Sequence, residues 1–599
     1  MNLRKHLTTA LNQSAQAVLA SADDLEQSRP SFEVTPSDRP DLADYQSNAA
    51  MVLAKRLRKN PREIAQTIQG ALQKELGGTA QVDVAGAGFI NIRLADEYLL
   101  SVATANIADI HYGFERTLNP KQIMIDFGGP NIAKELHVGH LRPHLIGDSL
   151  QRLMRFYGDA VTSDIHMGDW GTPIGMIIAQ LEHEQPDLGY FKPDTPSEFT
   201  WSIDIEELGN LYRRSKQHWD DSPQFQDKAR RATEILQSGR LPAYRALWQR
   251  LRDVSLDDVR GLYQKLGVNF DLWLGESDVN DLLPVMMKEL TERGIAQTSE
   301  GATVIPAEVL GLPDAPPLIL MKGDGGYTYA ATDLATIQDR VRNRNADTII
   351  YVVDNRQKQH FEQVFSAARL AGYAPSDIAL IHAGHGTING KDGRPFKTRD
   401  GQTVRLKDVL DLAYQKAREQ LPEPDQQETS EAEINTLSNQ IGIAAIKFQE
   451  FTNGRNSDYA FDTDNFTSFE GKTGAYLQYT VARCGAILAK AADEKIETGA
   501  LKITNHPERD LLLHLVQFPE AVESTYLKQE PSMVANHAYR LAQLFSTFYA
   551  HAPVLREPEA SVRSSRLGLV DAIQRQMKLC LSLLGIEAPA RMLRKESAA

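Results

Sequence analysis

The spacing of apolar residues predicts a small α+β unit over the first 110 residues. Apolar positions recur at helical intervals over 3–19, 48–57 and 61–76, which predicts three helices. The alternating segment QVDVAGAGFINIRL follows and predicts strands. Its glycines at 86 and 88 indicate a bulge or a close approach by another part of the backbone.

From Lys121 the pattern changes to strand, glycine turn, helix and strand. This alternation is typical of a parallel α/β sheet. The predicted strands cover 123–127, 161–165 and 347–354, and the predicted helices cover 138–157 and 359–370, with another helix starting at about 172.

Residues 203–266 are almost wholly helical in period, so we expect a helical insertion in the sheet, with Trp201, Trp219 and Trp248 in its core. The acidic segment 421–433 predicts an exposed loop. From residue 434 the helical period continues to the C-terminus, which predicts an all-helical bundle. The expected domains are 1–110, 111–455 with the insertion at about 195–270, and 456–599.

The composition and charge of the chain exclude several classes of protein. The chain has 599 residues, of which 65 are Lys or Arg and 79 are Asp or Glu, so its formal charge is −14. This charge argues against a nonspecific coat for nucleic acid or anionic membrane, although a local basic face for RNA remains open. The only cysteines, Cys484 and Cys580, exclude a disulfide framework or a cysteine zinc site and favour the cytosol. No segment has the ~20 uninterrupted apolar residues of a membrane span.

The segment IDFGGPNIAKELHVGHL, residues 125–141, carries the clearest chemistry. A strand ends, two glycines allow a tight turn, and a helix then begins near His137 and His140. Free N–H groups at a helix N-terminus bind phosphate well, and two imidazoles add donors. Gly139 has no Cβ, so a planar group such as adenine can lie against its backbone.

Zinc is the alternative chemistry for these histidines. His137, His140 and His144 are spaced i, i+3 and i+7, so they lie near one helix face and could supply metal ligands. We favour phosphate, because no HExxH glutamate accompanies them and the strand, glycine turn and helix form a phosphate-binding arrangement. We expect no bound metal here and interpret His382 and His385, a second HxxH, as incidental.

The segment PNIAKELHVGH resembles the HIGH signature of class I aminoacyl-tRNA synthetases, in the form found in arginyl-tRNA synthetases. The resemblance extends in order along nearly the whole chain. The other segments that carry it are MGDWGT at 167–172, DGGYTYAATDLA at 324–335, GKDGRPFKTRDGQTVRLKDVL at 390–410, GAYLQYTVAR at 474–483 and LLGIEAPARM at 583–592.

The resemblance implies a Rossmann-like parallel-sheet catalytic domain with a HIGH motif, an N-terminal α+β appended domain and a C-terminal all-α anticodon-binding bundle. It implies a cytoplasmic arginine–tRNA ligase, which makes arginyl-adenylate from L-arginine and ATP with Mg²⁺, releasing pyrophosphate. The arginyl group then passes to the terminal ribose 2′-hydroxyl of tRNA(Arg), releasing AMP. We expect a monomer. The residues expected to hold ATP are Pro130, Lys134, His137, Gly139 and His140, with His137 and His140 also catalytic.

The chain departs from the family in its cationic loop. Members usually carry KMSKS, whose lysines stabilise the pyrophosphate leaving group, and this sequence has no KMSKS. The corresponding loop reads FKTRD at 396–400. In similar arginine enzymes an upstream lysine substitutes, which here corresponds to Lys391. We therefore expect Lys391 and Lys397 to be catalytic, with Arg399 as a further candidate.

A pocket for arginine needs carboxylates that can hold a planar guanidinium through paired hydrogen bonds. Tyr329 and Asp333 are spaced i, i+4 and therefore share a helix face. The resemblance places them on the guanidinium. It also places Asp126 and Asn131 on the substrate amino group and adds Gln357 to the pocket.

Two further departures lie near the expected pocket. Pro173 and Ile174 replace the Gln-Phe that commonly follows GDWGT, and Gly128-Gly129 replaces the Ser-Ser of some members. In the bundle we expect Phe545 and Phe548 in the core and Tyr539 and Tyr549 on tRNA. In the N-terminal domain, the expected tRNA contacts are Phe89 and Asn91.

Two other functions remain open at the level of sequence. A noncatalytic RNA-binding paralogue would fit the missing KMSKS, but the intact histidine turn and Asp333 argue against it. A smaller nucleotidyltransferase with an HxGH helix would not account for the C-terminal bundle.

Overall fold

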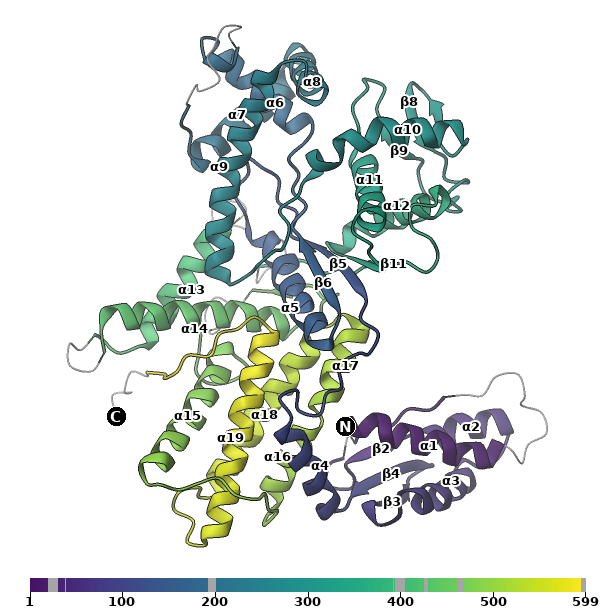
Figure 1. Cartoon of the computed structure of the whole chain (residues 1–599), viewed down its shortest axis with the longest axis vertical. Helices are drawn as coiled ribbons and strands as arrows, with labels where there is room; N and C mark the ends of the chain where they lie inside the picture. The colour runs from purple at the N-terminus through teal and green to yellow at the C-terminus, as the bar shows by residue number, and fades with distance from the viewer. Residues whose placement is uncertain are drawn as a thin grey trace. The chain divides into compact units, whose positions relative to one another are not determined.

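The computed structural model describes residues 1–19, 31–37, 39–191, 201–390, 393, 404–424, 429–461 and 467–593. The chain forms two compact units (Figure 1). Unit 1 contains residues 1–116, 469–582 and 587–593, and unit 2 contains 117–468 with 583–586 and 594–599. The expected boundaries at 110 and 455 stay predictions.

Unit 1 begins with the α+β module that the sequence predicts. Its antiparallel sheet has the order β1-β2-β4-β3. Gly88 lies in the β3–β4 turn, where an added Cβ would be 3.0 Å from the Pro61 carbonyl oxygen, so this glycine allows a close backbone approach. The elements are α1 (Leu3–Leu19), β1 (Thr35–Pro36), β2 (Tyr45–Ser47), α2 (Ala49–Leu57), α3 (Pro61–Leu76), the 3₁₀ turn η1 (Gly77–Thr79), β3 (Ala80–Ala85), β4 (Phe89–Leu94) and α4 (Asp96–Ala108).

The rest of unit 1 is the helical bundle. Phe545 and Phe548 are 1% and 0% exposed, which confirms their prediction as core residues. The helices are α15 (Gly474–Asp493), α16 (His506–Val516), α17 (Phe518–Lys528), α18 (Ser532–His551) and α19 (Ala560–Leu583).

A buried ion pair joins the module to the bundle inside unit 1. The guanidinium of Arg509 donates to both carboxylate oxygens of Asp44, at 2.8 and 2.9 Å, and also to Asp96 at 2.7 Å. Asp44 also accepts from the Leu94 amide. Because the Asp44 carboxylate is almost completely buried, its stabilisation depends on these partners.

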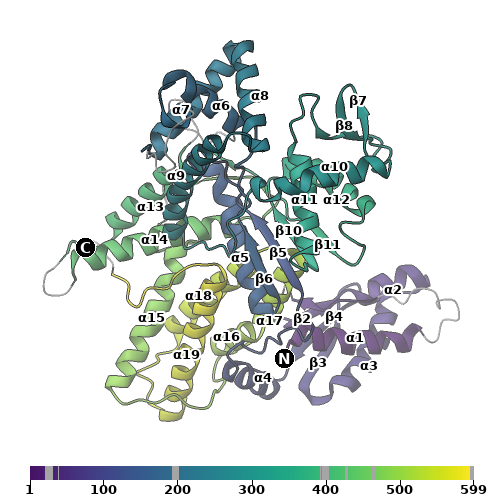
Figure 2. The ribbon, with the colours of Figure 1, turned by 45° about the horizontal axis from the view of Figure 1, so that its top comes forward.

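Unit 2 is built on a parallel sheet of order β11-β10-β5-β6 (Figure 2). The strands are β5 (Gln122–Phe127), β6 (Ala160–Asp164), β10 (Thr348–Val352) and β11 (Ala379–His382). They pair in parallel, with Asp126 opposite Asp164 in β6 and Tyr351 in β10. Helix α5 (Leu141–Tyr157) follows the 3₁₀ turn η2 (Val138–His140) and ends at Gly158, whose φ of +116° suits a helix C-cap.

The predicted insertion is helical, and it contains α6 (Thr172–Glu184), the 3₁₀ turn η3 (Gly189–Phe191), α7 (Ile205–Asp221), α8 (Pro223–Ser238) and α9 (Pro242–Leu266). Trp201, Trp219 and Trp248 are only partly buried and pack on the rim of its core, so their prediction as core anchors was wrong. Ile174 is in that core instead, at 2% exposure. Pro173 lies in the first turn of α6.

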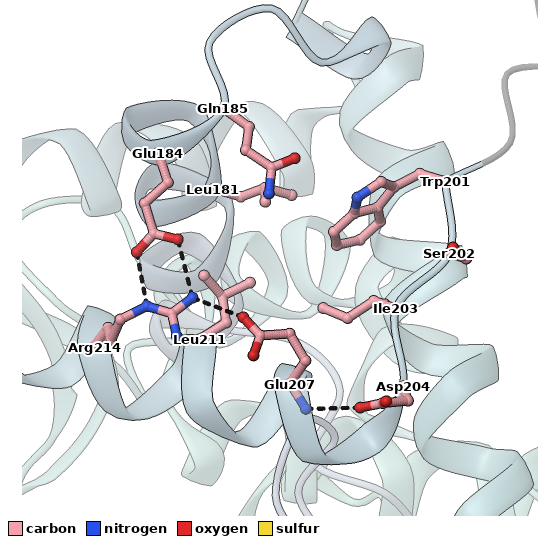
Figure 3. A pocket seen from close by; sticks show the side chains of 10 residues that line it. All are labelled: Leu181, Glu184, Gln185, Trp201, Ser202, Ile203, Asp204, Glu207, Leu211 and Arg214. Atoms are coloured by element: carbon pink, nitrogen blue, oxygen red, sulfur yellow. Dashed lines mark hydrogen bonds and ion pairs between the residues drawn. The ribbon is translucent and has the colours of Figure 1, made fainter.

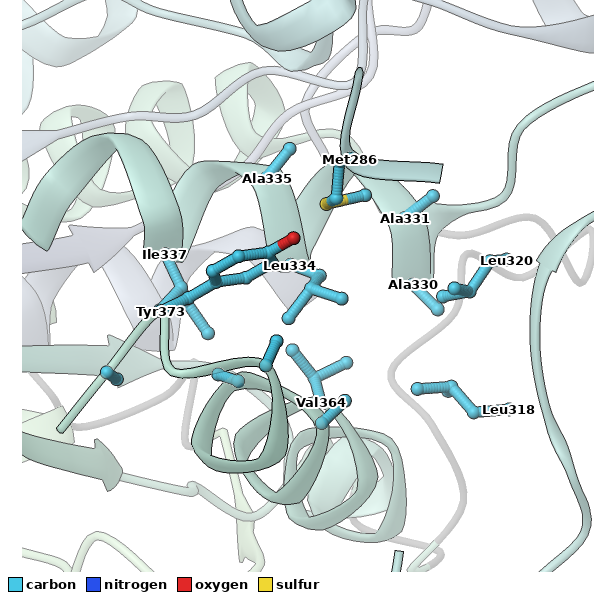
Figure 4. Packing of buried hydrophobic residues seen from close by; sticks show 14 of the residues in the cluster. Met286, Leu318, Leu320, Ala330, Ala331, Leu334, Ala335, Ile337, Val364 and Tyr373 are labelled. Atoms are coloured by element: carbon cyan, nitrogen blue, oxygen red, sulfur yellow. The ribbon is translucent and has the colours of Figure 1, made fainter. Parts of the chain in front are cut away.

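The periodicity did not indicate the three-stranded antiparallel sheet β7-β8-β9, whose strands have only three or four residues. Its strand β9 packs with α10, α11 and α12 around Leu334, Leu320 and Tyr373 (Figure 4). The elements here are the 3₁₀ turn η4 (Glu276–Leu282), α10 (Leu283–Glu292), β7 (Gln297–Ser299), β8 (Ala302–Ile305), β9 (Leu318–Met321), α11 (Tyr329–Arg342), the 3₁₀ turn η5 (Asn355–Gln357) and α12 (Lys358–Ala371).

The remaining elements of unit 2 are β12 (Ile388–Asn389), α13 (Leu406–Gln420), α14 (Glu431–Phe451) and β13 (Tyr459–Ala460). Helix α14 is tied to α5 by a buried ion pair, in which Arg142 Nε bonds Glu450 at 3.0 Å. Within the described ranges, each helix is too short or too polar to cross a bilayer.

We predict that Asp44→Asn will destabilise unit 1, because it removes one charge of a buried pair and leaves the Arg509 guanidinium with only the more exposed Asp96 as a counterion. Breaking such a pair costs about 3–5 kcal/mol. The measurement is the thermal midpoint of the purified protein. Asp41→Asn is the control, since Asp41 pairs with Arg39 at an exposed site and its loss should leave the midpoint unchanged. Equal midpoints for both variants would contradict the assignment.

Candidate functional site

A cavity of about 730 Å³ opens at the carboxyl ends of the parallel strands. Asp126, the next-to-last residue of β5, lines it, as do His166 after β6, Asp354 after β10 and His385 after β11. In the sheet, β6 and β10 lie on opposite sides of β5. The cavity therefore lies at the point where the strand order reverses. Ligands of open α/β sheets bind at such points.

The histidine turn forms one wall of the cavity. His137, Gly139 and His140 all line it. The Nδ1 atom of His137 accepts from the Gly139 amide, and the Nδ1 atom of His140 accepts from the His137 amide, both at 3.1 Å. These bonds assign the proton of each neutral ring to Nε2. Burial lowers the pKa of His137 and lowers that of His140 to about 3, so both rings are neutral donors near pH 7.

A buried charge network lies beneath this wall. Arg340 of α11 donates to Asp126 at 2.6 Å and to Asp164 at 2.8 Å, and its side chain is 1% exposed. Burial opposes the charge on His166, but the hydrogen bond to Asp164 and the negative charge of Asp126 raise its pKa to about 9. Two positive and two negative groups therefore balance, which reduces the cost of burying them.

Helix α11 contributes to a second, acidic wall of the cavity. Its apolar face packs on α10, α12 and β9, so the face with spacing i, i+4 and i+11 carries Tyr329, Asp333 and Arg340 toward the sheet. Tyr329 and Asp333 line the cavity together, as their spacing predicted. His360 bonds Asp333 at 2.6 Å through Nε2 and fixes the orientation of its carboxylate.

Glu276 is a second carboxylate on this wall, and sequence reasoning did not identify it. It lines the cavity and is 8% exposed. Burial raises its pKa to about 8, and the nearby charge of Asp333 acts in the same direction. Burial raises the pKa of Tyr329, and the negative charges of Glu276 and Asp333 raise it further. The phenol and the two carboxylates all line the cavity.

The GDWGT segment holds Glu276 in place. Asp169 accepts from the Ser277 amide at 3.0 Å and from its hydroxyl at 2.8 Å. It also pairs with Arg252 at 3.1 Å. An added Cβ at Gly275 would lie 2.5 Å from the Asp169 carboxylate, so this segment and η4 pack very closely. Neither Pro173 nor Ile174 is among the residues that line the cavity.

The other predicted ligands of ATP and arginine are divided between the cavity and its surroundings. Asn131 and Gln357 line the cavity. Pro130 is buried and bonds the Gly168 amide through its carbonyl at 3.0 Å. Lys134 Nζ lies 4.6 Å from the centre of the Tyr212 ring. Neither Pro130 nor Lys134 is among the residues that line the cavity.

Lys391, Lys397 and Arg399 lie outside the described residues. The backbone on both sides of that segment is held by hydrogen bonds. Ile388 and Asn389 pair in parallel with β13. On the other side, Val138 donates to the Val404 carbonyl at 2.9 Å, and Leu406 donates to the Leu136 carbonyl at 2.8 Å. The histidine turn is thus connected directly to the chain that follows the cationic segment.

Two other groups of side chains do not form alternative active sites. A hollow of about 460 Å³ in the insertion contains Arg214, which is bonded to Glu184 and Glu207 (Figure 3). None of the predicted site residues lines this hollow.

Asp126, Asp164 and His166 are close enough to resemble metal ligands, but the Arg340 guanidinium already bonds both carboxylates. Their geometry is that of an ion-pair network.

The zinc alternative for the histidine turn does not fit the hydrogen bonds. Both ring nitrogens of His144 are already engaged, one by the His140 carbonyl and the other by the Tyr263 hydroxyl. An imidazole binds a metal through one ring nitrogen, so zinc held by all three histidines would have to displace one of these two bonds.

The predicted tRNA contacts lie in unit 1. Phe89 is 39% exposed, and its neighbour Asn91 lies on the same strand. Tyr549 is 37% exposed and stacks with Arg483, whose guanidinium carbon is 4.1 Å from the ring centre. Tyr539 is partly buried beside Tyr476 and Lys472.

A family model described as tRNA synthetases class I (R), catalytic domain, matches residues 102–463. The chain belongs to the class I arginyl-tRNA synthetases. Models of the arginyl tRNA synthetase N terminal domain and the DALR anticodon binding domain match residues 1–94 and 477–592.

Curated relatives and solved structures agree with this assignment. The arginine–tRNA ligase of Maricaulis maris (strain MCS10) is 44% identical over 588 residues, covering 96% of this chain and 98% of that protein. Arginyl-tRNA synthetase of Thermus thermophilus has a TM-score of 0.80 at 25% identity, covering 98% and 100% of the two chains. Arginyl-tRNA synthetase of Plasmodium falciparum has a TM-score of 0.79 at 26% identity, covering 99% of this chain and 100% of that chain.

The synthetase attaches arginine to tRNA(Arg) and uses ATP. The predicted class I catalytic fold with N-terminal and helical C-terminal domains is confirmed. Besides Glu276, sequence reasoning missed His166 and His360, and it interpreted His385 as incidental although this residue lines the cavity. Spacing could not connect these residues, because they follow different strands or lie on different helices.

We predict that Arg340→Gln will destabilise the synthetase, because two buried carboxylates then share one remaining cation, His166. The expected loss is about 3–5 kcal/mol, seen as a lower thermal midpoint. Arg344→Gln is the control, since Arg344 bonds Asp339 at a partly exposed site just beyond the same helix. A drop in Arg344→Gln that matched the one in Arg340→Gln would show that the buried network has no special role.

Proposed function

We propose that this single cavity binds ATP on its histidine wall and arginine on its acidic wall, so that the arginine carboxylate meets the α-phosphorus between them. The observation that supports this is that His137 and His140 line the same cavity as Glu276, Tyr329 and Asp333. Positioning and charge stabilisation supply most of the catalysis in such a transfer.

On the histidine wall, the Nε2–H groups of His137 and His140 donate to the phosphates of ATP. Because both rings are neutral near pH 7, they act as directed donors rather than as charges. Gly139 offers a flat backbone surface for the nucleoside. Mg²⁺ enters with ATP and is held mainly by the phosphate oxygens. Lys391 and Lys397 supply the positive charge for departing pyrophosphate, and Pro130 and Lys134 support ATP from the turn.

On the acidic wall, Asp333 and Glu276 grip the arginine guanidinium from two sides, and the Tyr329 hydroxyl completes the contact. Only a planar, forked cation can bond two carboxylates in this way, and lysine cannot. Asp126 and Asn131 hold the substrate amino group, with Gln357 at the edge of the pocket. Burial raises the pKa of Asp126, and the positive charge of Arg340 opposes that rise and favours the carboxylate form that the amino group needs.

The tRNA is contacted by unit 1. Tyr549 with Arg483, and Tyr539 on the same helix, offer surfaces on which unpaired bases stack. Phe89 and Asn91 provide a second contact through the N-terminal module. The chain acts as a monomer in the cytoplasm, in keeping with two cysteines that are buried and unlinked.

We predict that Asp333→Asn will raise the KM for arginine by about 10- to 100-fold, since a hydrogen bond to a charged group is worth about 1.5–3 kcal/mol. The KM for ATP should change less than about twofold. The measurement is charging of purified tRNA with labelled arginine. Asp339→Asn, a change on the same helix away from the cavity, is the control. Equal increases in both KM values would refute the pocket, as would efficient charging with lysine.

We predict that the KM for arginine falls as pH rises from 6.5 to 8.5. The pKa of Glu276 in the arginine-free enzyme is about 8, so below that pH the group is neutral and must lose its proton to pair with the guanidinium. The expected change is about 25-fold across this range for a single group of that pKa, measured at saturating ATP. Glu276→Gln should have a higher KM with little pH dependence. A pH dependence retained in Glu276→Gln would assign the titration to another group.

A further inference from the structure

The buried side chain of His144 is not used by the proposed binding of ATP or arginine. It lies one helical turn after His140 and is 0% exposed. Its Nδ1 bonds the His140 carbonyl, and its Nε2 bonds the Tyr263 hydroxyl of α9. A carbonyl can only accept, so the His144 proton is on Nδ1 and Tyr263 must donate to Nε2. One defined tautomer therefore satisfies both bonds.

The glycine turn after β5 leaves the space that His144 occupies. Gly128 has a φ of +99°, and an added Cβ would lie 2.5 Å from Nε2 and 2.9 Å from Cδ2 of His144. Such separations are too short for nonbonded atoms, so a side chain at 128 and the imidazole at 144 cannot both keep their places. The adjacent Gly129 differs, because its Cβ would meet only the His166 carbonyl, at 3.6 Å.

Aromatic packing fixes the imidazole from its other sides. The ring centres of His144 and Tyr263 are 4.6 Å apart, and Phe270 lies edge-on to His144 at 6.4 Å. Phe270 in turn stacks on Phe127 of β5 at 4.3 Å. Burial lowers the pKa of His144 to about 4 and keeps Tyr263 protonated, which agrees with the neutral donor and acceptor roles above.

We propose that His144 is a positioning residue for ATP, which holds the glycine turn and the histidine turn at a fixed separation, and that Gly128 is required because its missing side chain makes room for that imidazole. The imidazole is in contact with both turns: it packs on Gly128 and bonds the carbonyl of His140. Through these contacts it sets where the Nε2–H donor of His140 lies relative to the end of β5. The proposal rests on the proposed role of His140 in ATP binding.

The test is a double-mutant cycle with Gly128→Ser and His144→Ser, read out as kcat/KM for ATP in ATP–pyrophosphate exchange with tRNA present. Gly128→Ser alone should lower this value by about 10- to 100-fold, the order expected for a misplacement of about 1 Å. In the His144→Ser background, which removes the clash, the same change should cost less than about threefold. Backbone strain at position 128 is present in both backgrounds and cancels in the cycle.

Gly129→Ser provides the matched cycle, because this position also has a positive φ but no contact with His144. It should show no coupling to His144→Ser. A merely structural role would reduce the amount of active enzyme and leave the KM for ATP unchanged, so the KM is reported separately from kcat. The proposal is overturned if Gly128→Ser costs the same in both backgrounds, or if the Gly129 cycle shows equal coupling.

Tyr263→Phe keeps the proposal testable if the serine variants fail to fold. It removes only the hydroxyl that donates to His144, and should raise the KM for ATP about fivefold, the equivalent of one neutral hydrogen bond. An unchanged KM for ATP in a folded Tyr263→Phe enzyme would also overturn the proposal. His140→Ala separates the two claims, because a normal KM for ATP in that variant would refute the proposed ATP site itself.

Discussion

The bonds from Arg340 to Asp126 and Asp164 are the constraint on which the rest of the site depends. The two carboxylates end adjacent parallel strands, and without a cation between them their charges would repel at low dielectric. The cation comes from α11, the helix that also carries Tyr329 and Asp333. One buried guanidinium therefore fixes the distance between the sheet and the helix that presents the acidic wall. Each substrate residue on α11 takes its position from this internal bond and from the apolar core behind the helix.

In the proposed function, the two walls of the cavity recognise their ligands by different means. The histidine wall depends on backbone geometry: amides set the tautomers of His137 and His140, and glycines let parts of the chain approach closely. It offers neutral donors to an anionic ligand. The acidic wall depends on side chains. The pKa of its Glu276 is raised mainly by burial, and the charge of Asp333 acts in the same direction. In the proposed function, a cationic ligand favours the ionised form of Glu276, because burial is what raises the pKa of that group most.

Sequence patterns predicted the parts of the site that are local in the chain. The histidine turn, the i, i+4 pair on α11 and the main helices and parallel strands all follow from spacing that the structure keeps. Glu276 and His360 could not be found in this way, since their relation to Asp333 depends on η4 and α12 packing beside α11. The short strands β7 to β9 and the rim positions of the three tryptophans depend likewise on tertiary packing, which a one-dimensional pattern does not contain.

The backbone pairing on both sides of residues 391–403 has a consequence for how this part of the chain can evolve. Main-chain hydrogen bonds do not depend on the identity of the side chains. The backbone bonds of β12 and of residues 404–406 are therefore compatible with any amino acids between these two points. The entropic cost of closing a loop also grows only slowly with its length. A lysine can therefore migrate along this stretch, or the stretch can gain and lose residues, while the chain that follows it stays hydrogen-bonded to the histidine turn.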